Sequence, residues 1–176
     1  SRYNVFGYDD FETYASADVY YISLNKKEFS LKYILSILNS KLVYFWLYWI
    51  GKRKGEMLEL YFEPLQFIPI KKITSEEQSF FIKLADFIIF LKQQEQVTDI
   101  NKLFSIYFEQ IVDGMVYDLY FPELLKQNNR TIIEHLGELP AFTESMSDNQ
   151  KLEIINTVFN RLTEKNHPVR VNLFYM

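Results

Sequence analysis

The chain of 176 residues contains no cysteine, two histidines, five glycines and five prolines. The lack of cysteine excludes disulfides and thiolate metal sites, and His135 and His167 are too far apart in sequence to suggest a histidine metal cluster. The glycines occur singly, so there is no glycine-rich phosphate loop, and no serine lies in the context of a nucleophile elbow. We therefore expect no catalytic residue, metal, cofactor or small-molecule substrate in this chain.

Acidic and histidine side chains offer no clear alternative site. The nearest approach to a catalytic cluster is formed by Glu109, Asp113 and Asp118, which we expect on the solvated flank of an amphipathic helix. His135 lies among apolar residues and is expected to be partly buried and hydrogen-bonded. His167 precedes a proline and is expected in a turn.

The chain has no excess of positive charge, since its formal net charge is −4, so contact with a polyanion requires a local patch. One such patch follows the aromatic run of residues 44–50, where Lys52, Arg53 and Lys54 lie between Gly51 and Gly55. The three cations either complement the end of a helix dipole or form a tight loop that contacts phosphate or guanine. Composition alone favours neither interpretation. Further lysines that could extend the patch are Lys71, Lys72, Lys26 and Lys27.

Residues 31–50 are long and apolar enough to raise the possibility of a membrane span. Lys32 lies near the start and Asn39, Ser40 and Lys41 lie in the middle. A central lysine costs about 2.5–3.5 kcal/mol on insertion scales. A buried amphipathic helix, capped by Ser30 and ended by Gly51, is therefore expected, and no membrane contact is predicted.

The rest of the pattern predicts an α+β fold, with a mixed α/β unit followed by a mainly helical half. A strand is expected over residues 18–24, and an extended stretch around Pro69. Three amphipathic helices should follow, the first opened by a Ser75–Gln78 capping box, the second ended by Pro122 and the third opened at Ser147. The loops are expected at residues 126–131 and 143–150. The predicted divisions are 1–73, 74–125 and 126–176.

Four short boxes, in this order, resemble a known family: "LNSKL" at 38–42, "IPI" at 68–70, "EEQSFFIKLAD" at 76–86 and "IVDGMVYDLYF" at 111–121. The chain is similar over about residues 18–121 to the TaqI-like C-terminal specificity domain. That family occurs in adenine-specific DNA methyltransferases and fused type IIG restriction–modification enzymes, with type I specificity subunits as more distant relatives. Residues 122–176 match no pattern of the family.

The resemblance implies a non-catalytic DNA target-recognition domain. Its partners would be duplex DNA and an upstream methyltransferase domain of the same polypeptide, which would bind S-adenosylmethionine and flip the adenine in a prokaryotic cytoplasm. The start "SRYNVFGYDD", without an initiator methionine, is expected to be a cut within a longer protein. Whether that parent also cleaves DNA stays open.

Site residues follow from the resemblance by position and charge. The DNA-binding residues would be Lys52, Arg53 and Lys54, with Lys71 and Lys72 beside them. Structural roles are expected for five residues: Asn39, Ser40, Gly51, Gly55 and Pro69. Asn39 and Ser40 should hydrogen-bond the backbone of an adjoining sheet. The alternative function is a helical protein–protein interaction module with no direct DNA contact.

Overall fold

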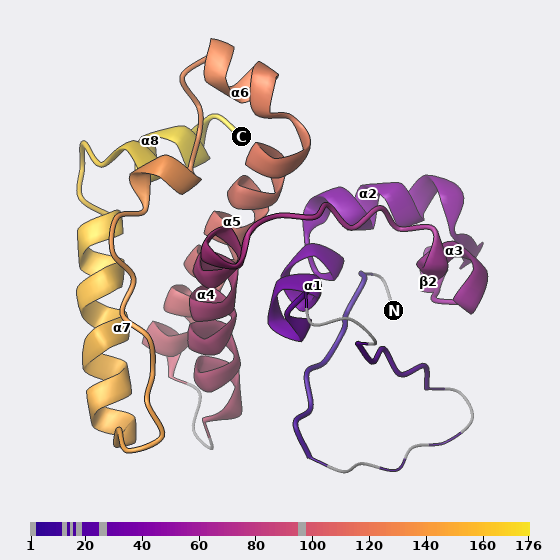
Figure 1. Ribbon diagram of the computed structural model, residues 1–176, viewed down its shortest axis with the longest axis horizontal. Helices are drawn as coiled ribbons and strands as arrows, with labels where there is room; N and C mark the ends of the chain where they lie inside the picture. Colours follow the sequence, from indigo (N-terminus) through magenta and orange to yellow (C-terminus); the bar gives the residue numbers. More distant parts are fainter. Residues whose placement is uncertain (1–2, 12–13, 15, 17–18, 25–27, 95–97) are drawn as a thin grey trace. The chain divides into compact units, whose positions relative to one another are not determined.

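The computed structural model describes residues 3–11, 14, 16, 19–24, 28–94 and 98–176 (Figure 1). Contacts along the chain divide it into two compact units, Ser1–Gln78 and Ser79–Met176. The helices, together with one two-stranded antiparallel sheet among the described residues, confirm the predicted α+β class. The three sequence divisions ending at residues 73, 125 and 176 stay predictions.

The first unit contains helices α1 (Leu31–Leu38) and α2 (Lys41–Ile50), the strands β1 (Lys52–Lys54) and β2 (Met57–Glu59), and the short helix α3 (Phe62–Gln66). Ser30 caps α1 as predicted, since its side chain accepts a hydrogen bond from the Lys32 amide. The prediction of one continuous helix over residues 31–50 is wrong, because Ser40 begins a new helix by capping α2 through the Val43 amide. The core of this unit includes Tyr33, Ile37, Val43, Leu47, Leu58 and Ile68.

The strand predicted over residues 18–24 is wrong for the part that the structure describes. Residues 19–24 lie in neither a helix nor a strand, and Tyr20 and Tyr21 are exposed. Strand propensity measures how well a side chain fits a pleated and half-buried surface. No strand among the described residues pairs with this segment, so that surface is not provided.

Helix α4 (Ser75–Gln93) begins in the first unit and continues into the second. The predicted capping box is displaced by one residue. The Thr74 hydroxyl accepts from the Glu77 amide, while the Glu77 carboxylate accepts from the Thr74 amide. Gln78 is instead buried, and its side chain pairs with the main chain of Ser30 and Glu28.

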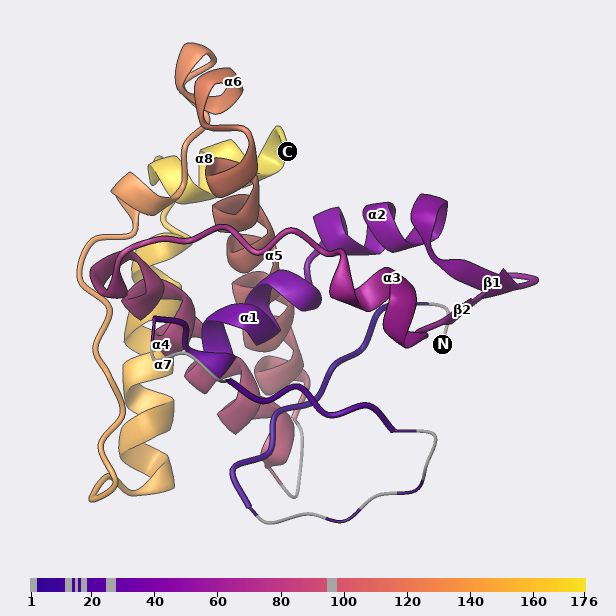
Figure 2. The ribbon, with the colours of Figure 1, turned by 45° about the vertical axis from the view of Figure 1, so that its right-hand side comes forward.

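In the second unit α4, α5 (Asp99–Tyr120) and α7 (Asp148–Leu162) run side by side (Figures 1 and 2). Phe87 of α4 packs against Phe108 of α5, with ring centroids 5.6 Å apart, and Phe104 of α5 packs 4.5 Å from Phe159 of α7. The predicted start of the third helix is confirmed, since Ser147 caps α7 and forms a capping box with Gln150. The chain also forms α6 (Pro122–Gln127), the 3₁₀ turn η1 (Ile133–His135) and α8 (Pro168–Phe174).

No helix among the described residues has the length and apolar character needed to cross a bilayer.

Candidate nucleic-acid interface

The three consecutive cations lie on a β-hairpin. Lys52–Lys54 form β1, which pairs antiparallel with β2 through the register Lys52 with Glu59, Arg53 with Leu58 and Lys54 with Met57. Gly55 begins the two-residue turn with φ +62°, a conformation that glycine adopts without strain. The prediction of a tight loop is therefore wrong: a strand carries the three residues.

The strand separates the cations onto two faces. Successive side chains of a strand point to opposite faces, and directly paired residues share a face. Arg53 therefore shares its face with Leu58, which is 5% exposed, whereas Lys52 and Lys54 lie on the other face with Met57 and Glu59. The three charges are not presented together.

Each cation has a different set of contacts. The Arg53 guanidinium lies over the Tyr48 ring of α2, 4.0 Å from its centroid. The Lys52 ammonium lies 4.7 Å from the centroid of the Tyr61 ring and 3.7 Å from the Glu59 carboxylate. For Lys54, no ion pair or ring contact with another described residue is present, and its side chain is exposed.

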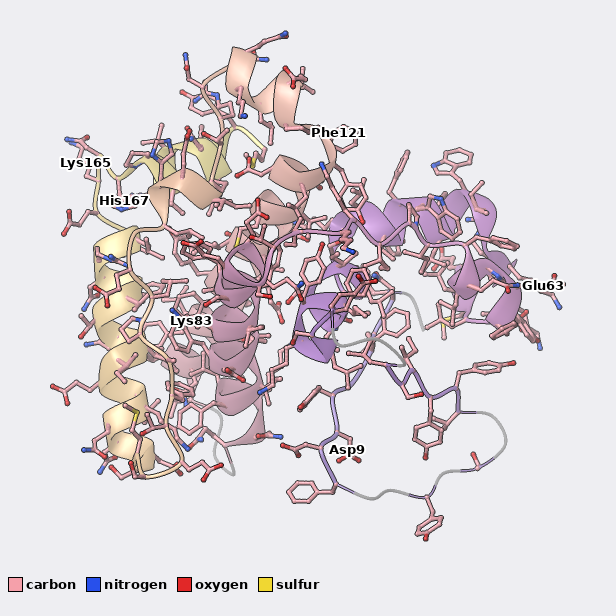
Figure 3. All side chains as sticks on the ribbon, viewed as in Figure 1. Asp9, Glu63, Lys83, Phe121, Lys165 and His167 are labelled. Carbon is pink, nitrogen blue, oxygen red and sulfur yellow. The ribbon has the colours of Figure 1, made fainter. Side chains whose placement is uncertain are left out.

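Carboxylates surround the hairpin and reduce its field. Glu56 lies in the turn, Glu59 on β2 and Glu63 on α3, so residues 52–63 contain three cations and three carboxylates. Figure 3 shows Glu63 extending outward from α3. The formal charge of this region is zero, so long-range attraction of a polyanion by the hairpin is weak.

An exposed aromatic surface adjoins the hairpin at the end of α2. The rings of Tyr48 and Trp49 pack edge to face with centroids 5.5 Å apart, and Phe45 packs against Trp49. Other large apolar side chains exposed in this part of the chain are Ile50, Met57, Tyr61, Phe62 and Phe67. The cations Arg53 and Lys52 cover parts of this surface rather than lying away from it.

The structure places Lys71 and Lys72 near α1 and not beside the hairpin. The main-chain carbonyl of Lys71 accepts a hydrogen bond from the Tyr33 hydroxyl, and the Lys72 ammonium pairs with the Glu28 carboxylate. The hairpin follows α2 at the end distant from α1 (Figure 2). Lys26 and Lys27 lie outside the described residues.

Residues at the break between α1 and α2 bind the segment that precedes α1. The Asn39 side chain donates to the Phe6 carbonyl (3.0 Å) and accepts from the Phe6 amide (2.9 Å). Asn4 donates to the main-chain carbonyls of Leu38 and Ser40. The Asn39 side chain thus reaches an irregular segment and not a sheet as predicted. The Ser40 hydroxyl instead donates to the Ile37 carbonyl and accepts from the Val43 amide. The role of Asn4 was missed, since nothing in its local sequence marks it.

Gly51 and Gly55 flank the first strand of the hairpin, and Pro69 lies further along the chain, after α3. Gly51 is the C-cap of α2, and a Cβ atom there would lie 2.5 Å from the Leu47 carbonyl oxygen. Gly55 supplies the positive φ of the turn. Pro69 is exposed in the irregular segment after α3, directly after the buried Ile68.

Of the acidic residues, Asp118 differs most from the predicted solvated face. Its carboxylate accepts hydrogen bonds from the amides of Ile132 (2.6 Å) and Ile133 (2.7 Å) at the start of η1. Burial raises the pKa of Asp118, although these two amides act in the opposite direction. Glu109 forms an ion pair with Lys92. These contacts position the chain at η1 and join α4 to α5.

The histidines also have structural contacts. His135 is half-buried in η1, and its Nε2 atom lies 3.5 Å from the Glu134 carboxylate. His167 caps α8, where its Nδ1 atom accepts from the Val169 amide. Burial, followed by the charge of Arg161, lowers the pKa of His167. Within the described part of the chain, no group of three acidic or histidine side chains could hold a metal ion.

The part of the chain that carries the hairpin is also the part with a family match. Residues 1–70 match the TaqI-like C-terminal specificity domain. The match confirms the predicted resemblance for this region, which contains the boxes at 38–42 and 68–70. It ends before the other two boxes, whose assignment stays a prediction. No curated protein and no solved structure is significantly similar to the chain.

Proposed function

We propose that the chain is a non-catalytic DNA target-recognition domain, which docks on duplex DNA and chooses the sequence modified by an upstream methyltransferase domain of the same polypeptide. The match of residues 1–70 to a specificity domain carries this proposal. The exposed hairpin with its arginine and lysines supports it, because a recognition module needs donors held on a rigid scaffold. S-adenosylmethionine would bind to the upstream domain, since this sequence lacks a glycine-rich cofactor loop.

Duplex binding as a function of salt tests the proposal. We would measure the affinity of the chain for a pool of random duplexes by fluorescence anisotropy at several salt concentrations. Replacing Lys52, Arg53 and Lys54 together by alanine should weaken binding and reduce the dependence on salt. The matched control replaces three exposed lysines of the second unit, Lys102, Lys126 and Lys165, and so changes the net charge equally.

The control separates a local site from a general charge effect. Lys165 lies in the turn between α7 and α8 (Figure 3). If both triple variants lose affinity equally, the hairpin is not the site of contact. If the unchanged chain binds no duplex at any salt concentration, the proposed function is wrong.

The second candidate is a helical protein–protein interaction module. The exposed aromatic side chains of Phe45, Trp49 and Phe67, which are 61%, 66% and 67% exposed, favour it. This module would leave duplex DNA unbound and would lose its partner when Phe45 and Trp49 become polar. The placement of Arg53 over Tyr48, within the same surface, favours the DNA-binding function over it.

A further inference from the structure

Arg53 is held differently from its two lysine neighbours. Its guanidinium lies 4.0 Å from the centroid of the Tyr48 ring, and Tyr48 in turn packs against Trp49 at 5.5 Å and Tyr44 at 6.2 Å. The opposite strand residue, Leu58, is buried and fixes the hairpin in the unit. Arg53 is nevertheless exposed. Its side chain is therefore both accessible and restrained.

This restraint matters because of what a guanidinium can recognise. Arginine has about 2 kcal/mol of rotamer entropy to lose when it is immobilised, and contact with an aromatic ring removes part of that freedom in advance. Its planar fork of N–H donors matches the O6 and N7 acceptors of guanine in the major groove. A two-stranded β-ribbon fits into that groove.

The charges around the hairpin favour base reading over phosphate anchoring. Three carboxylates offset the three cations of residues 52–63. Lys52 already has the Glu59 carboxylate within 3.7 Å. Of the three cations, Lys54 is therefore the main contributor to the sequence-independent term that counterion release supplies. The contribution of Arg53 should come chiefly from short-range hydrogen bonds, which carry sequence information when they reach base edges.

We propose that Arg53, positioned over Tyr48, reads a guanine through a bidentate contact in the major groove of the target, and that the hairpin supplies specificity more than affinity. This inference rests on the proposed function, since it names what the DNA-binding hairpin recognises. Lys54 then contacts a phosphate of the same groove and has no part in base selection.

The test begins with selection of preferred sequences from a random duplex pool by the unchanged chain. Each guanine of the preferred duplex is then replaced by 7-deazaguanine, which lacks the N7 acceptor. At one position the affinity should fall by about 5-fold, the lower end of the range for loss of a bidentate contact, because N7 is lost and O6 is kept. Arg53→Ala removes every donor, so the preference for that guanine should disappear. Arg53→Lys keeps the charge but loses the planar fork, so the preference should weaken while the salt dependence stays the same.

Three further variants separate positioning from charge. Tyr48→Phe keeps the ring and should retain the preference, whereas Tyr48→Leu should lose it at unchanged salt dependence. Lys54→Ala should weaken binding to all sequences alike, with the salt slope reduced by about 0.9. Circular dichroism of each variant would establish that the helices are retained.

The outcomes distinguish this inference from the proposed function. If the chain binds duplexes in a salt-dependent way but Arg53→Ala keeps the guanine preference, the inference is overturned and the function stands. The inference is also overturned, and the function again stands, if 7-deazaguanine has no effect at any position. If no duplex binds, both fail.

Discussion

The carboxylate of Asp118 gives the sharpest test of how the second unit is held together. It accepts two main-chain amides, those of Ile132 and Ile133, at the start of η1. Replacing it by alanine removes Oδ2, the single acceptor of both bonds, from a 3₁₀ turn that begins beside the fully buried Ile132. Hydrogen bonds to a charged group contribute about 1.5–3 kcal/mol each. Because Asp118 is only partly buried and water can replace some of the contact, we expect a loss of about 3 kcal/mol in total.

The asparagine variant separates the acceptor from its charge. Burial raises the pKa of Asp118 above its unfolded value of 3.8. The folded state therefore penalises the ionised form more than the unfolded chain does, and Asp118→Asn, which removes the charge but keeps one acceptor oxygen, should lose less stability at pH 7 than Asp118→Ala.

The pH dependence has a definite sign. The stability that the protonated carboxyl contributes is fully present below pH 3.8 and is lost as the pH rises through the raised, folded pKa. The wild-type stability minus that of Asp118→Asn should thus fall across this interval. Glu134 raises and His135 lowers the same pKa, so both should be left unchanged in these variants.

Urea unfolding followed by circular dichroism at several pH values would measure both effects. Glu153→Ala, an exposed acidic residue on α7, is the control and should change stability by less than about 0.5 kcal/mol. If Asp118→Ala is as stable as this control, the two amides do not depend on the carboxylate. A difference curve that rises with pH would contradict the assigned direction of the pKa shift.

Three further expectations concern packing and hydrogen bonds. Gly114→Ala should destabilise by about 1 kcal/mol in thermal unfolding, because the new Cβ would lie 2.8 Å from Ile132, and the cost of overpacking exceeds the gain in helix propensity. Asn39→Ala removes two bonds to the Phe6 main chain and should cost about 1–2 kcal/mol in urea unfolding. Burial raises the pKa of Tyr107 to about 12. The protonated hydroxyl therefore contributes fully to the free energy of unfolding below pH 10, and this contribution should be lost between pH 10 and 12 in alkaline unfolding. Tyr107→Phe should lack that loss.

Features set by neighbouring residues were predictable from the sequence. Ser30 and Ser147 cap helices where expected, because an N-cap needs only a side chain and an amide two or three positions later. At α4 two overlapping capping boxes were available, Thr74 with Glu77 and Ser75 with Gln78. The Gln78 side chain already bonds the Ser30 amide and the Glu28 carbonyl, so it cannot form a box with Ser75. The helix is therefore capped by Thr74 and Glu77.

Features set by distant contacts were not predictable. The carboxylate of Asp118 is 14 residues from the first amide that it binds, and helical periodicity places it merely on a flank. The hairpin has three residues in each strand, and lysine and arginine give no strand signal. It depends on Leu58 being buried, which no local pattern reveals.

Side chains alternate between the two faces of a strand, so a run of like charges in the sequence does not by itself indicate a binding site. A helix end or loop would have presented Lys52, Arg53 and Lys54 together, and their summed charge would have favoured phosphate. As a strand, the run is divided between two faces, and the register sets Glu59 directly opposite Lys52. What remains distinctive is the geometry of one side chain of the run, because of these three residues Arg53 alone combines a planar fork with an aromatic ring that holds it. Recognition by this hairpin should therefore depend on directional hydrogen bonds. Loss of these bonds should change the sequence preference of the chain more than its overall affinity for DNA.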